Sequence, residues 1–148
     1  MVKRVSKSIP SLINRTQIRV RFSEVDSMQI VWHGEYVRYF EDGREAFGRQ
    51  YSGLGYMEIY KSGFVTPIVK INIDYKSPLV CGELAIVETR FINTGAAKIM
   101  FEYTIYRESD NQVVASGESV QVFLNKDNQL ELINPDFYLQ WKAKWGVQ

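Results

Sequence analysis

The chain has 148 residues and an almost balanced charge, with 18 Lys and Arg against 17 Asp and Glu. That length suits one domain with a single core, and the balance provides no net field to attract nucleic acid or an anionic membrane surface. No apolar run approaches the ~18 residues that span a bilayer, and the N-terminus lacks the apolar centre of a signal peptide. We therefore expect a cytoplasmic protein that binds neither nucleic acid nor a membrane.

The composition also limits the chemistry. Cys81 is the only cysteine, so no internal disulfide can form, and one Cys with one His cannot make a conventional zinc site. No glycine-rich phosphate loop and no Gly-x-Ser-x-Gly motif occurs. We therefore expect no metal and no cofactor, and neither nucleotide hydrolysis nor serine esterase activity.

The first residues differ from the rest of the chain. Residues 1–15 carry four basic side chains with little periodicity, which predicts a mobile arm ahead of a single domain over residues 16–148. Residues 16–22 alternate apolar and polar side chains, which is the period of a half-buried strand. Small and acidic residues break this alternation over residues 23–27, so the sequence predicts a turn that carries Asp26.

A helix is predicted from Gly34 onward, where the apolar period changes to about 3.6 residues. His33 and Gly34 stand where Ser, Thr, Asp or Asn would normally cap a helix, so its first N–H groups lack a local side-chain acceptor. Free donors and the helix dipole together favour an anion or a developing oxyanion at this place. Gly43 lies on the apolar side and costs roughly 1 kcal/mol relative to Ala, which indicates close approach of the helix to a sheet.

The remainder of the chain is mostly strand. Alternating segments separated by turn residues predict four strands, over residues 69–75, 84–91, 99–105 and 113–124. One strand, a long helix and four strands with connections suited to a meander indicate an α+β domain. Asn134-Pro135 fits the start of a closing helix, and Phe137, Trp141 and Trp145 recur on one side of it, which we interpret as a packing face.

One set of motifs points to a known family. In chain order the motifs are Glu24-Val-Asp26, Ile30-Val-Trp-His33, Tyr36, Glu41-x-x-Arg44, and Tyr75-Lys-Ser-Pro78 with Gly82-Glu83. Together they resemble the hotdog-fold acyl-CoA thioesterases of the 4-hydroxybenzoyl-CoA thioesterase type, over roughly residues 15–125. The resemblance implies a long central helix wrapped by a five-stranded antiparallel sheet, and two subunits that join their sheets edge to edge. It also implies active sites at the dimer interface and frequent pairing of dimers into tetramers.

The resemblance also implies catalytic roles. The family's catalytic carboxylate falls on Asp26, and the backbone N–H that polarises the carbonyl falls on His33; the loop and the helix start indicate the same two places. Asp26 either attacks the thioester or acts as a general base. Locally, Asp26 is also a residue that can form a turn with its own backbone, and the His33 ring is a second candidate base or pH switch.

Four further positions each have two interpretations. Trp32 and Tyr36 either line an acyl pocket or belong to the core. Glu41 is the reserve catalytic carboxylate, because some relatives place a Glu on the central helix; otherwise Glu41 and Arg44 form an i, i+3 ion pair. Glu24 either modulates the catalytic carboxylate or is solvated, and we favour a solvated side chain.

The sequence therefore predicts an acyl-CoA thioesterase that releases CoA and a carboxylic acid, as a homodimer or a dimer-of-dimers tetramer. A thioester of acyl-carrier protein is an alternative substrate. Two rival functions stay open. One is a hotdog dehydratase or hydratase that acts on acyl-CoA through the His33 ring, and the other is a non-catalytic module that binds acyl-CoA or acyl-carrier protein. The sequence does not specify the acyl group, whether aromatic, short or long.

Overall fold

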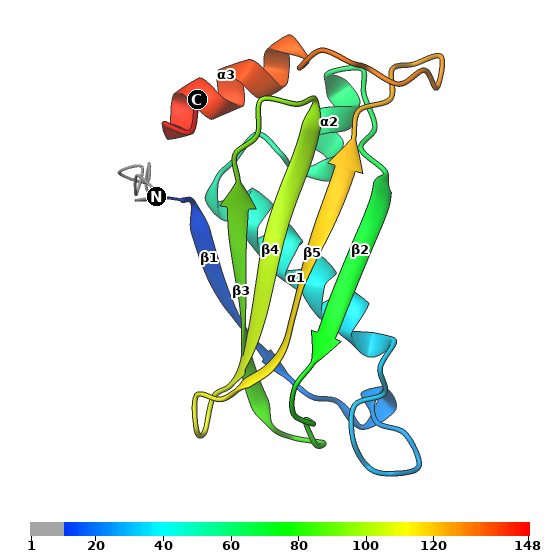
Figure 1. Ribbon diagram of the computed structural model, residues 1–148, viewed down its shortest axis with the longest axis vertical. Coiled ribbons are helices and arrows are strands. Elements are labelled where there is room, and N and C mark those ends of the chain that lie inside the picture. Colours follow the sequence, from blue (N-terminus) through cyan, green and yellow to red (C-terminus); the bar gives the residue numbers. More distant parts are fainter. Residues whose placement is uncertain (1–10) are drawn as a thin grey trace, which may run out of the picture.

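The computed structural model describes residues 11–148 and shows a five-stranded antiparallel sheet curled around one long helix, with a short helix closing one end (Figure 1). In chain order the elements are β1 (Ile13–Arg19), the 3₁₀ turn η1 (Phe22–Glu24), α1 (Glu35–Gln50), α2 (Tyr56–Lys61), β2 (Ile68–Tyr75), β3 (Leu84–Ile92), β4 (Lys98–Arg107), β5 (Val113–Val122) and α3 (Asp136–Trp145). The predicted α+β hotdog fold is confirmed, including the short C-terminal helix.

β2, the strand that follows the two helices in the chain, lies at the edge of the sheet opposite β1. The spatial order is β1-β3-β4-β5-β2, and every neighbouring pair is antiparallel. β3, β4 and β5 form the expected meander, whereas β2 crosses over to pair with β5, with Tyr75 opposite Ala115. β1 and β2 are therefore the two edge strands of the described sheet (Figure 1).

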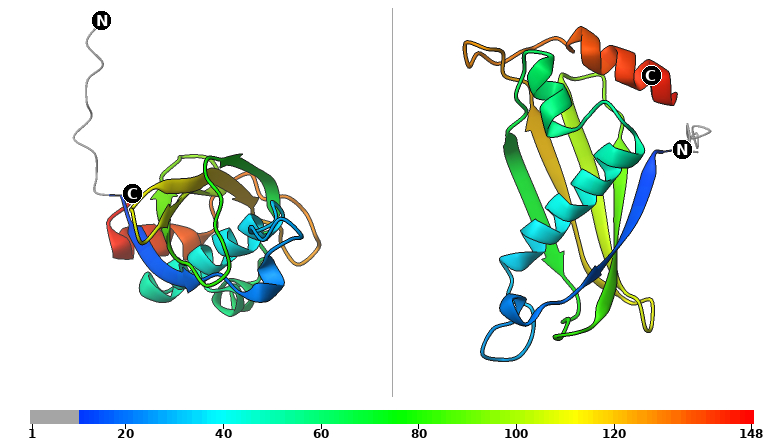
Figure 2. Two further views of the ribbon diagram at one scale, coloured as in Figure 1. Left: turned by 90° about the horizontal axis from the view of Figure 1, so that it is seen from below. Right: turned by 180° about the vertical axis from the view of Figure 1, so that it is seen from behind.

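The core lies between α1 and the concave face of the sheet (Figure 2). The apolar side of α1 is buried, as its 3.6-residue period predicts. Phe40 stacks on Tyr103 of β4 with 4.4 Å between ring centroids, and Phe47 meets Phe101 edge-on at 5.0 Å. Both phenylalanines of α1 are fully buried, so their contacts set the orientation of the helix against the sheet.

Gly43 marks a place where α1 comes close to β3. A Cβ atom on Gly43 would lie 2.7 Å from Cγ1 of Val87 and would also contact Oγ1 of Thr89. Val87 and Thr89 belong to β3 and are fully buried. The predicted close approach of helix and sheet is confirmed, and it explains why a residue of poor helix propensity stands in the middle of α1.

We expect Gly43→Ala to destabilise the protein, although Ala is the better helix former. The propensity gain of roughly 1 kcal/mol is offset by overpacking of a tight core site, which typically costs about 1–3 kcal/mol. Urea unfolding should show a free energy of unfolding lower by up to about 2 kcal/mol. Asp42→Ala changes the exposed neighbour on α1 and should stay within ~0.5 kcal/mol. A Gly43→Ala protein as stable as the wild type would contradict the close approach.

The shorter helices differ in part from their predictions. α2 has no counterpart among the predicted elements, because its six residues are too few to show a helical period. α3 begins one residue later than predicted, with Pro135 as its N-cap residue. The predicted packing face is confirmed, since Trp141 is buried and Phe137 and Trp145 pack against the core. No helix within residues 11–148 is long and apolar enough to cross a membrane.

The start of the domain also shifts. β1 begins at Ile13, three residues before the predicted strand, and pairs with β3 from that residue onward. Asn14 is buried there, and its amide donates to the Gln50 side chain at 2.7 Å, so the apolar alternation that marks the rest of the strand is missing. Residues 13–15 are therefore strand and not arm, while residues 1–10 of the predicted arm lie outside the described residues.

Candidate active site

The acidic loop before α1 folds back on itself. Val25 forms an isolated antiparallel bridge with Val31. Inside this bridge the Asp26 N–H donates to the Ile30 carbonyl at 2.9 Å, and the Gln29 N–H donates to the Asp26 carbonyl at 2.9 Å. Asp26 is half-buried, so the catalytic candidate sits in a closed turn whose backbone hydrogen bonds fix its position.

The two carboxylate oxygens of Asp26 differ in their partners. Oδ1 accepts the Met28 N–H at 2.8 Å, which is the local turn that the sequence offered as an alternative role. Oδ2 accepts no hydrogen bond from any residue of the described part of the chain. Asp26 therefore closes its own turn with one oxygen and keeps the other available for chemistry.

The start of α1 lacks a side-chain cap, as predicted. Gly34 is the N-cap residue and makes no side-chain cap hydrogen bond. The His33 N–H donates to no acceptor within residues 11–148. The Trp32 ring lies over this turn, because a Cβ on Gly34 would come 2.8 Å from Trp32 Cζ2, and its indole N–H donates to Glu35 at 3.3 Å. An unpaired amide donor thus stands at the positive end of the helix dipole.

The loop brings Asp26 and the His33 amide to the same end of α1. The Trp32 N–H donates to the Glu24 carbonyl at 3.2 Å, so the two sides of the loop run antiparallel, and His33 lies three positions from Asp26 along the pair. A thioester carbonyl bound between them would need an attacking oxygen within ~3.5 Å of its carbon and a donor ~3 Å from its oxygen.

Trp32 and Tyr36 have different surroundings. Trp32 is 44% exposed beside the helix start, and the exposed His33 ring packs edge-on against it at 5.3 Å. Tyr36 is buried, and its ring meets those of Tyr39 and Tyr75 edge-on at 5.6 and 5.2 Å. Burial raises the pKa of the Tyr36 phenol, and Tyr75 adds to the rise. Tyr36 is therefore a core residue beneath the site, and Trp32 is the better placed of the two to contact a ligand.

Glu24 is not the solvated side chain that we predicted. Its Oε1 accepts the Tyr39 hydroxyl at 3.0 Å and the Arg21 N–H at 2.8 Å. Burial, followed by the Glu24 charge, raises the pKa of the Tyr39 phenol far above its ordinary value. Tyr39 lies one turn into α1. The hydrogen bond between Tyr39 and the Glu24 carboxylate therefore connects the acidic loop to the helix.

An arginine that the sequence analysis missed organises the segment between β2 and β3. Arg107, at the end of β4, pairs with Glu83 at 3.1 Å and donates to Oγ of Ser77 at 2.9 Å. The same segment supports the acidic loop, because the Val31 N–H donates to the Leu79 carbonyl at 2.9 Å. Ser77, Pro78 and Glu83 all contact Arg107, so the Tyr-x-x-Pro and Gly-Glu motifs have a structural role. No local pattern marks Arg107, since Ser77 is 30 residues away in sequence.

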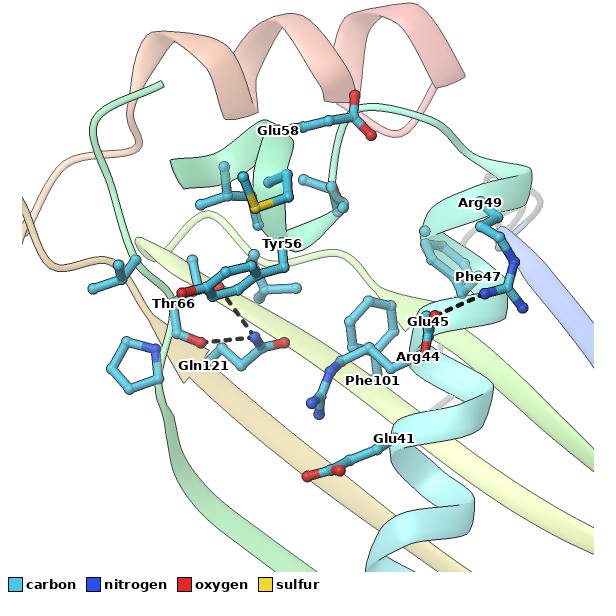
Figure 3. Close-up of a pocket in the computed structure, with 18 of the residues that line it drawn as sticks. Glu41, Arg44, Glu45, Phe47, Arg49, Tyr56, Glu58, Thr66, Phe101 and Gln121 are labelled. Atoms are coloured by element: carbon cyan, nitrogen blue, oxygen red, sulfur yellow. Dashed lines mark hydrogen bonds and ion pairs between the residues drawn. The ribbon is translucent and has the colours of Figure 1, made fainter. Parts of the chain in front are cut away.

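A cavity of about 860 Å³ lies beside the second half of α1, away from the helix start (Figure 3). Its walls come from α1, α2, the segment leading into β2, and strands β4 and β5. Much of the lining is apolar or aromatic, including Phe47, Tyr56, Ile59, Val65, Ile99 and Phe101. Neither Asp26 nor His33 lines it, so a single chain does not bring the predicted catalytic groups and this cavity together.

Glu41 and Arg44 extend from α1 into this cavity (Figure 3). The predicted ion pair between them is wrong, because no pair among the described residues joins these two side chains. Glu41 is exposed, and water screening leaves little to gain from such a pair. Nη1 of Arg44 is buried without a hydrogen-bond partner in the described chain. The reserve carboxylate is therefore a cavity residue and not part of the helix start.

The described residues offer few groups for metal binding. Within residues 11–148, no three His, Cys, Asp or Glu side chains gather in a way that could hold a metal ion. Cys81 is exposed in the turn between β2 and β3, and it does not line the cavity.

Comparison with known proteins assigns this chain to a family. The sequence profile described as the Thioesterase-like superfamily matches residues 20–141. The chain belongs to the thioesterase-like superfamily. The resemblance inferred from the motifs is thereby confirmed, and the profile covers the acidic loop, α1 and all the strands except β1.

Individual relatives of this thioesterase-like chain agree with the family assignment. YneP of Bacillus subtilis (strain 168), whose assignment as an acyl-CoA thioesterase is provisional, is 32% identical over 137 residues, which cover 89% of this chain and 98% of YneP. The DHNA-CoA thioesterase from Staphylococcus aureus has a TM-score of 0.80 at 22% identity, covering 91% of each chain. A 4-hydroxybenzoyl-CoA thioesterase in complex with 4-hydroxybenzoyl-CoA has a TM-score of 0.76 at 20% identity, covering 88% of this chain and 98% of that one. At these identities the two solved structures show a shared fold.

Proposed function

We propose that this chain hydrolyses an acyl-CoA thioester to a carboxylic acid and CoA. The observation that carries the proposal is the presence of a carboxylate oxygen without a partner, Asp26 Oδ2, and an unpaired amide, the His33 N–H, at one end of α1. Thioester hydrolysis needs an oxygen nucleophile or base and a donor for the oxygen that becomes negative. The family assignment and the provisional activity of YneP support this reaction.

In the proposed mechanism the thioester oxygen accepts the His33 N–H, and the dipole of α1 stabilises the negative charge that develops on it. Asp26 then acts in one of two ways. In the first, its carboxylate attacks the carbonyl carbon, the C–S bond breaks, CoA leaves as a thiolate, and water hydrolyses the resulting anhydride. In the second, Asp26 takes a proton from water, and the water oxygen attacks the same carbon and expels the thiolate.

A substrate complex of a structural neighbour supports a central role for an aspartate. The 4-hydroxybenzoyl-CoA thioesterase complex is of a variant in which one Asp is replaced by Asn. An amide oxygen does not attack a carbonyl or take a proton as a carboxylate does, so such a replacement suits the capture of an intact thioester. We assign the corresponding role here to Asp26, the carboxylate that lies directly before the helix.

We also propose that a second copy of the chain completes the site. The helix start and the cavity are separated along α1, whose 16 residues span about 24 Å. In a two-fold dimer with antiparallel helices, the helix start of one subunit would lie beside the cavity of the other. The edge strand β2 exposes Val69 and Tyr75, and pairing with a second β2 would cover this edge. The cavity, whose volume is typical of ligand sites, would then receive the acyl group.

We expect light scattering to give at least twice the mass of one chain, as a dimer or tetramer. Val69→Lys places a charge on the proposed interface, where burying it without a partner is costly, so this variant should become monomeric and lose most of its thiol release. Val113→Lys changes a valine that is also exposed, on β5, and should leave the oligomer and the rate unchanged. A monomeric wild type that hydrolyses acyl-CoA would contradict the shared site.

A variant of His33 tests the proposed reaction against its rivals. Because every residue except Pro keeps the backbone N–H, His33→Ala should retain most of the wild-type rate of CoA release. Chromatography of the products formed from saturated and enoyl-CoA substrates would measure both outcomes. A hydroxyacyl-CoA product that disappears in His33→Ala would favour the hydratase, and tight acyl-CoA binding without release of CoA would favour the binding module.

A further inference from the structure

The two peptide groups that flank His33 are each held through their carbonyl oxygens. On the N-terminal side, the Glu35 N–H donates to the Trp32 carbonyl at 3.0 Å. On the C-terminal side, the Tyr75 hydroxyl donates to the His33 carbonyl at 2.7 Å. The second bond crosses 42 residues of sequence, because the end of β2 lies beside the start of α1 (Figures 1 and 2).

Holding these carbonyls also orients the amide donors. A trans peptide is planar, so its N–H points opposite to its C=O. The Trp32 carbonyl therefore sets the direction of the His33 N–H, and the His33 carbonyl sets the direction of the Gly34 N–H. Only the φ and ψ angles of His33 lie between the two planes, and with both planes held, this residue has little freedom to turn its N–H away.

Tyr75 is itself held in place by the sheet and by α1. Its backbone pairs with Ala115 in the ladder between β2 and β5, and its ring meets the buried Tyr36 ring edge-on at 5.2 Å with an interplanar angle of 86°. Tyr36 belongs to the first turn of α1. The Tyr75 ring thus packs against α1, and its hydroxyl donates to the His33 carbonyl just before the same helix.

We propose that Tyr75 is a positioning residue for thioester hydrolysis, which fixes the His33–Gly34 peptide so that the amide donors at the start of α1 keep their aim at the thioester oxygen. The inference rests on the proposed function, and Tyr75 acts through His33 without touching the reacting atoms. Donors that are oriented beforehand need no reorganisation as the oxyanion forms. A misplacement of about 1 Å at such a site can cost on the order of 10²-fold in rate.

Tyr75→Phe tests the hydroxyl while keeping the ring that packs on Tyr36. We expect kcat for thiol release to fall by roughly tenfold, with KM changed by less than about twofold, since the lost orientation matters most in the transition state. Tyr138→Phe is the matched control, because the Tyr138 hydroxyl also donates to a backbone carbonyl, that of Lys98 at 3.3 Å. The control should lower the melting temperature and leave kcat unchanged.

The ¹⁵N shift of the Gly34 amide provides a readout that does not depend on turnover. Gly34 N–H shares its peptide with the His33 carbonyl, so loss of the Tyr75 hydrogen bond should move this signal in Tyr75→Phe and leave it in place in Tyr138→Phe. An unchanged kcat in a folded Tyr75→Phe protein would overturn the positioning role, as would a fall in kcat that only follows the loss of folded protein. If the wild type hydrolyses no thioester, the proposed function fails; an unmoved Gly34 signal would then overturn the anchoring as well, and a moved signal would support it.

Discussion

Asp26→Asn should lower kcat for thiol release by roughly 10²–10⁴-fold, the usual contribution of a positioned catalytic base. The substitution is close to isosteric, and the remaining side-chain oxygen can still accept the Met28 N–H that Oδ1 accepts at 2.8 Å. The lost group is the second oxygen, Oδ2, which has no partner in the described chain and which becomes an NH₂ donor. Steady-state kinetics would measure the loss, and circular dichroism and light scattering would check the fold and the oligomer.

Asp110 supplies the matched control for this substitution. Its Oδ1 accepts the Gln112 N–H at 3.1 Å in the turn between β4 and β5, so it forms the same kind of local turn. Its Oδ2 differs from that of Asp26 because it pairs with Arg107 at 2.9 Å, and the side-chain oxygen of Asn can still accept that Arg107 donor. Asp110→Asn should keep the wild-type kcat. Unchanged turnover in Asp26→Asn would remove Asp26 from the mechanism and direct attention to Glu41, whose Glu41→Gln variant should then be inactive.

Phe47→Ala should cost about 3–5 kcal/mol of unfolding free energy. Phe47 is fully buried on α1 and contacts the rings of Phe101, Tyr51 and Trp141, at 5.0, 4.6 and 6.3 Å between centroids. It therefore joins α1 to the sheet and to α3, and its truncation leaves a hole that neighbouring rings fill only in part. Chemical denaturation would measure the loss as a lower midpoint with an unchanged slope.

Phe22→Ala removes the same side chain from an exposed position. Phe22 is 83% exposed in η1, so this variant should stay within ~0.5 kcal/mol of the wild type. A Phe47→Ala protein that unfolds at the wild-type midpoint would show that the helix is not held by its aromatic contacts, and the assignment of this core would then be wrong.

Local sequence patterns were enough for most of the elements. The period change near Gly34 placed α1, alternation placed the strands, and Gly43 indicated the close approach to β3 that its contacts confirm. The uncapped helix start could also be predicted, because capping depends on the few residues around His33 and Gly34. Each of these features is determined within a short stretch of chain, where periodicity and residue type carry the information.

Features made by long-range contacts could not be predicted. The position of β2 beside β5 depends on pairing across the whole sheet, and a local pattern does not specify its partner. The contacts of Arg107, the bond between Tyr75 and His33, and the bond between Glu24 and Tyr39 were missed for the same reason, since the partners meet only in the folded chain. The predicted pair of Glu41 and Arg44 failed because spacing on a helix permits an ion pair but does not require one.

Asp26 does not line the cavity, which is why the proposed dimer matters for the function. The predicted catalytic residues lie at the start of α1, whereas the cavity lies along its second half. Within one chain, neither Asp26 nor His33 lines this cavity. The dimer, the cytoplasmic location and the choice between CoA and carrier-protein thioesters stay predictions, and the first of them decides whether the cavity and Asp26 work together.

Release of free thiol by the wild-type chain is the most direct test of the account. The substrates would be aromatic, short, medium and long acyl-CoA thioesters, together with an acyl-carrier-protein thioester. The amount of acid formed would be compared with the amount of thiol released. We predict turnover of at least one acyl-CoA with one acid formed for each thiol released, and the preferred acyl length would report the depth of the cavity. No release from any of these thioesters by the intact oligomer would contradict the proposed hydrolase and favour the binding module.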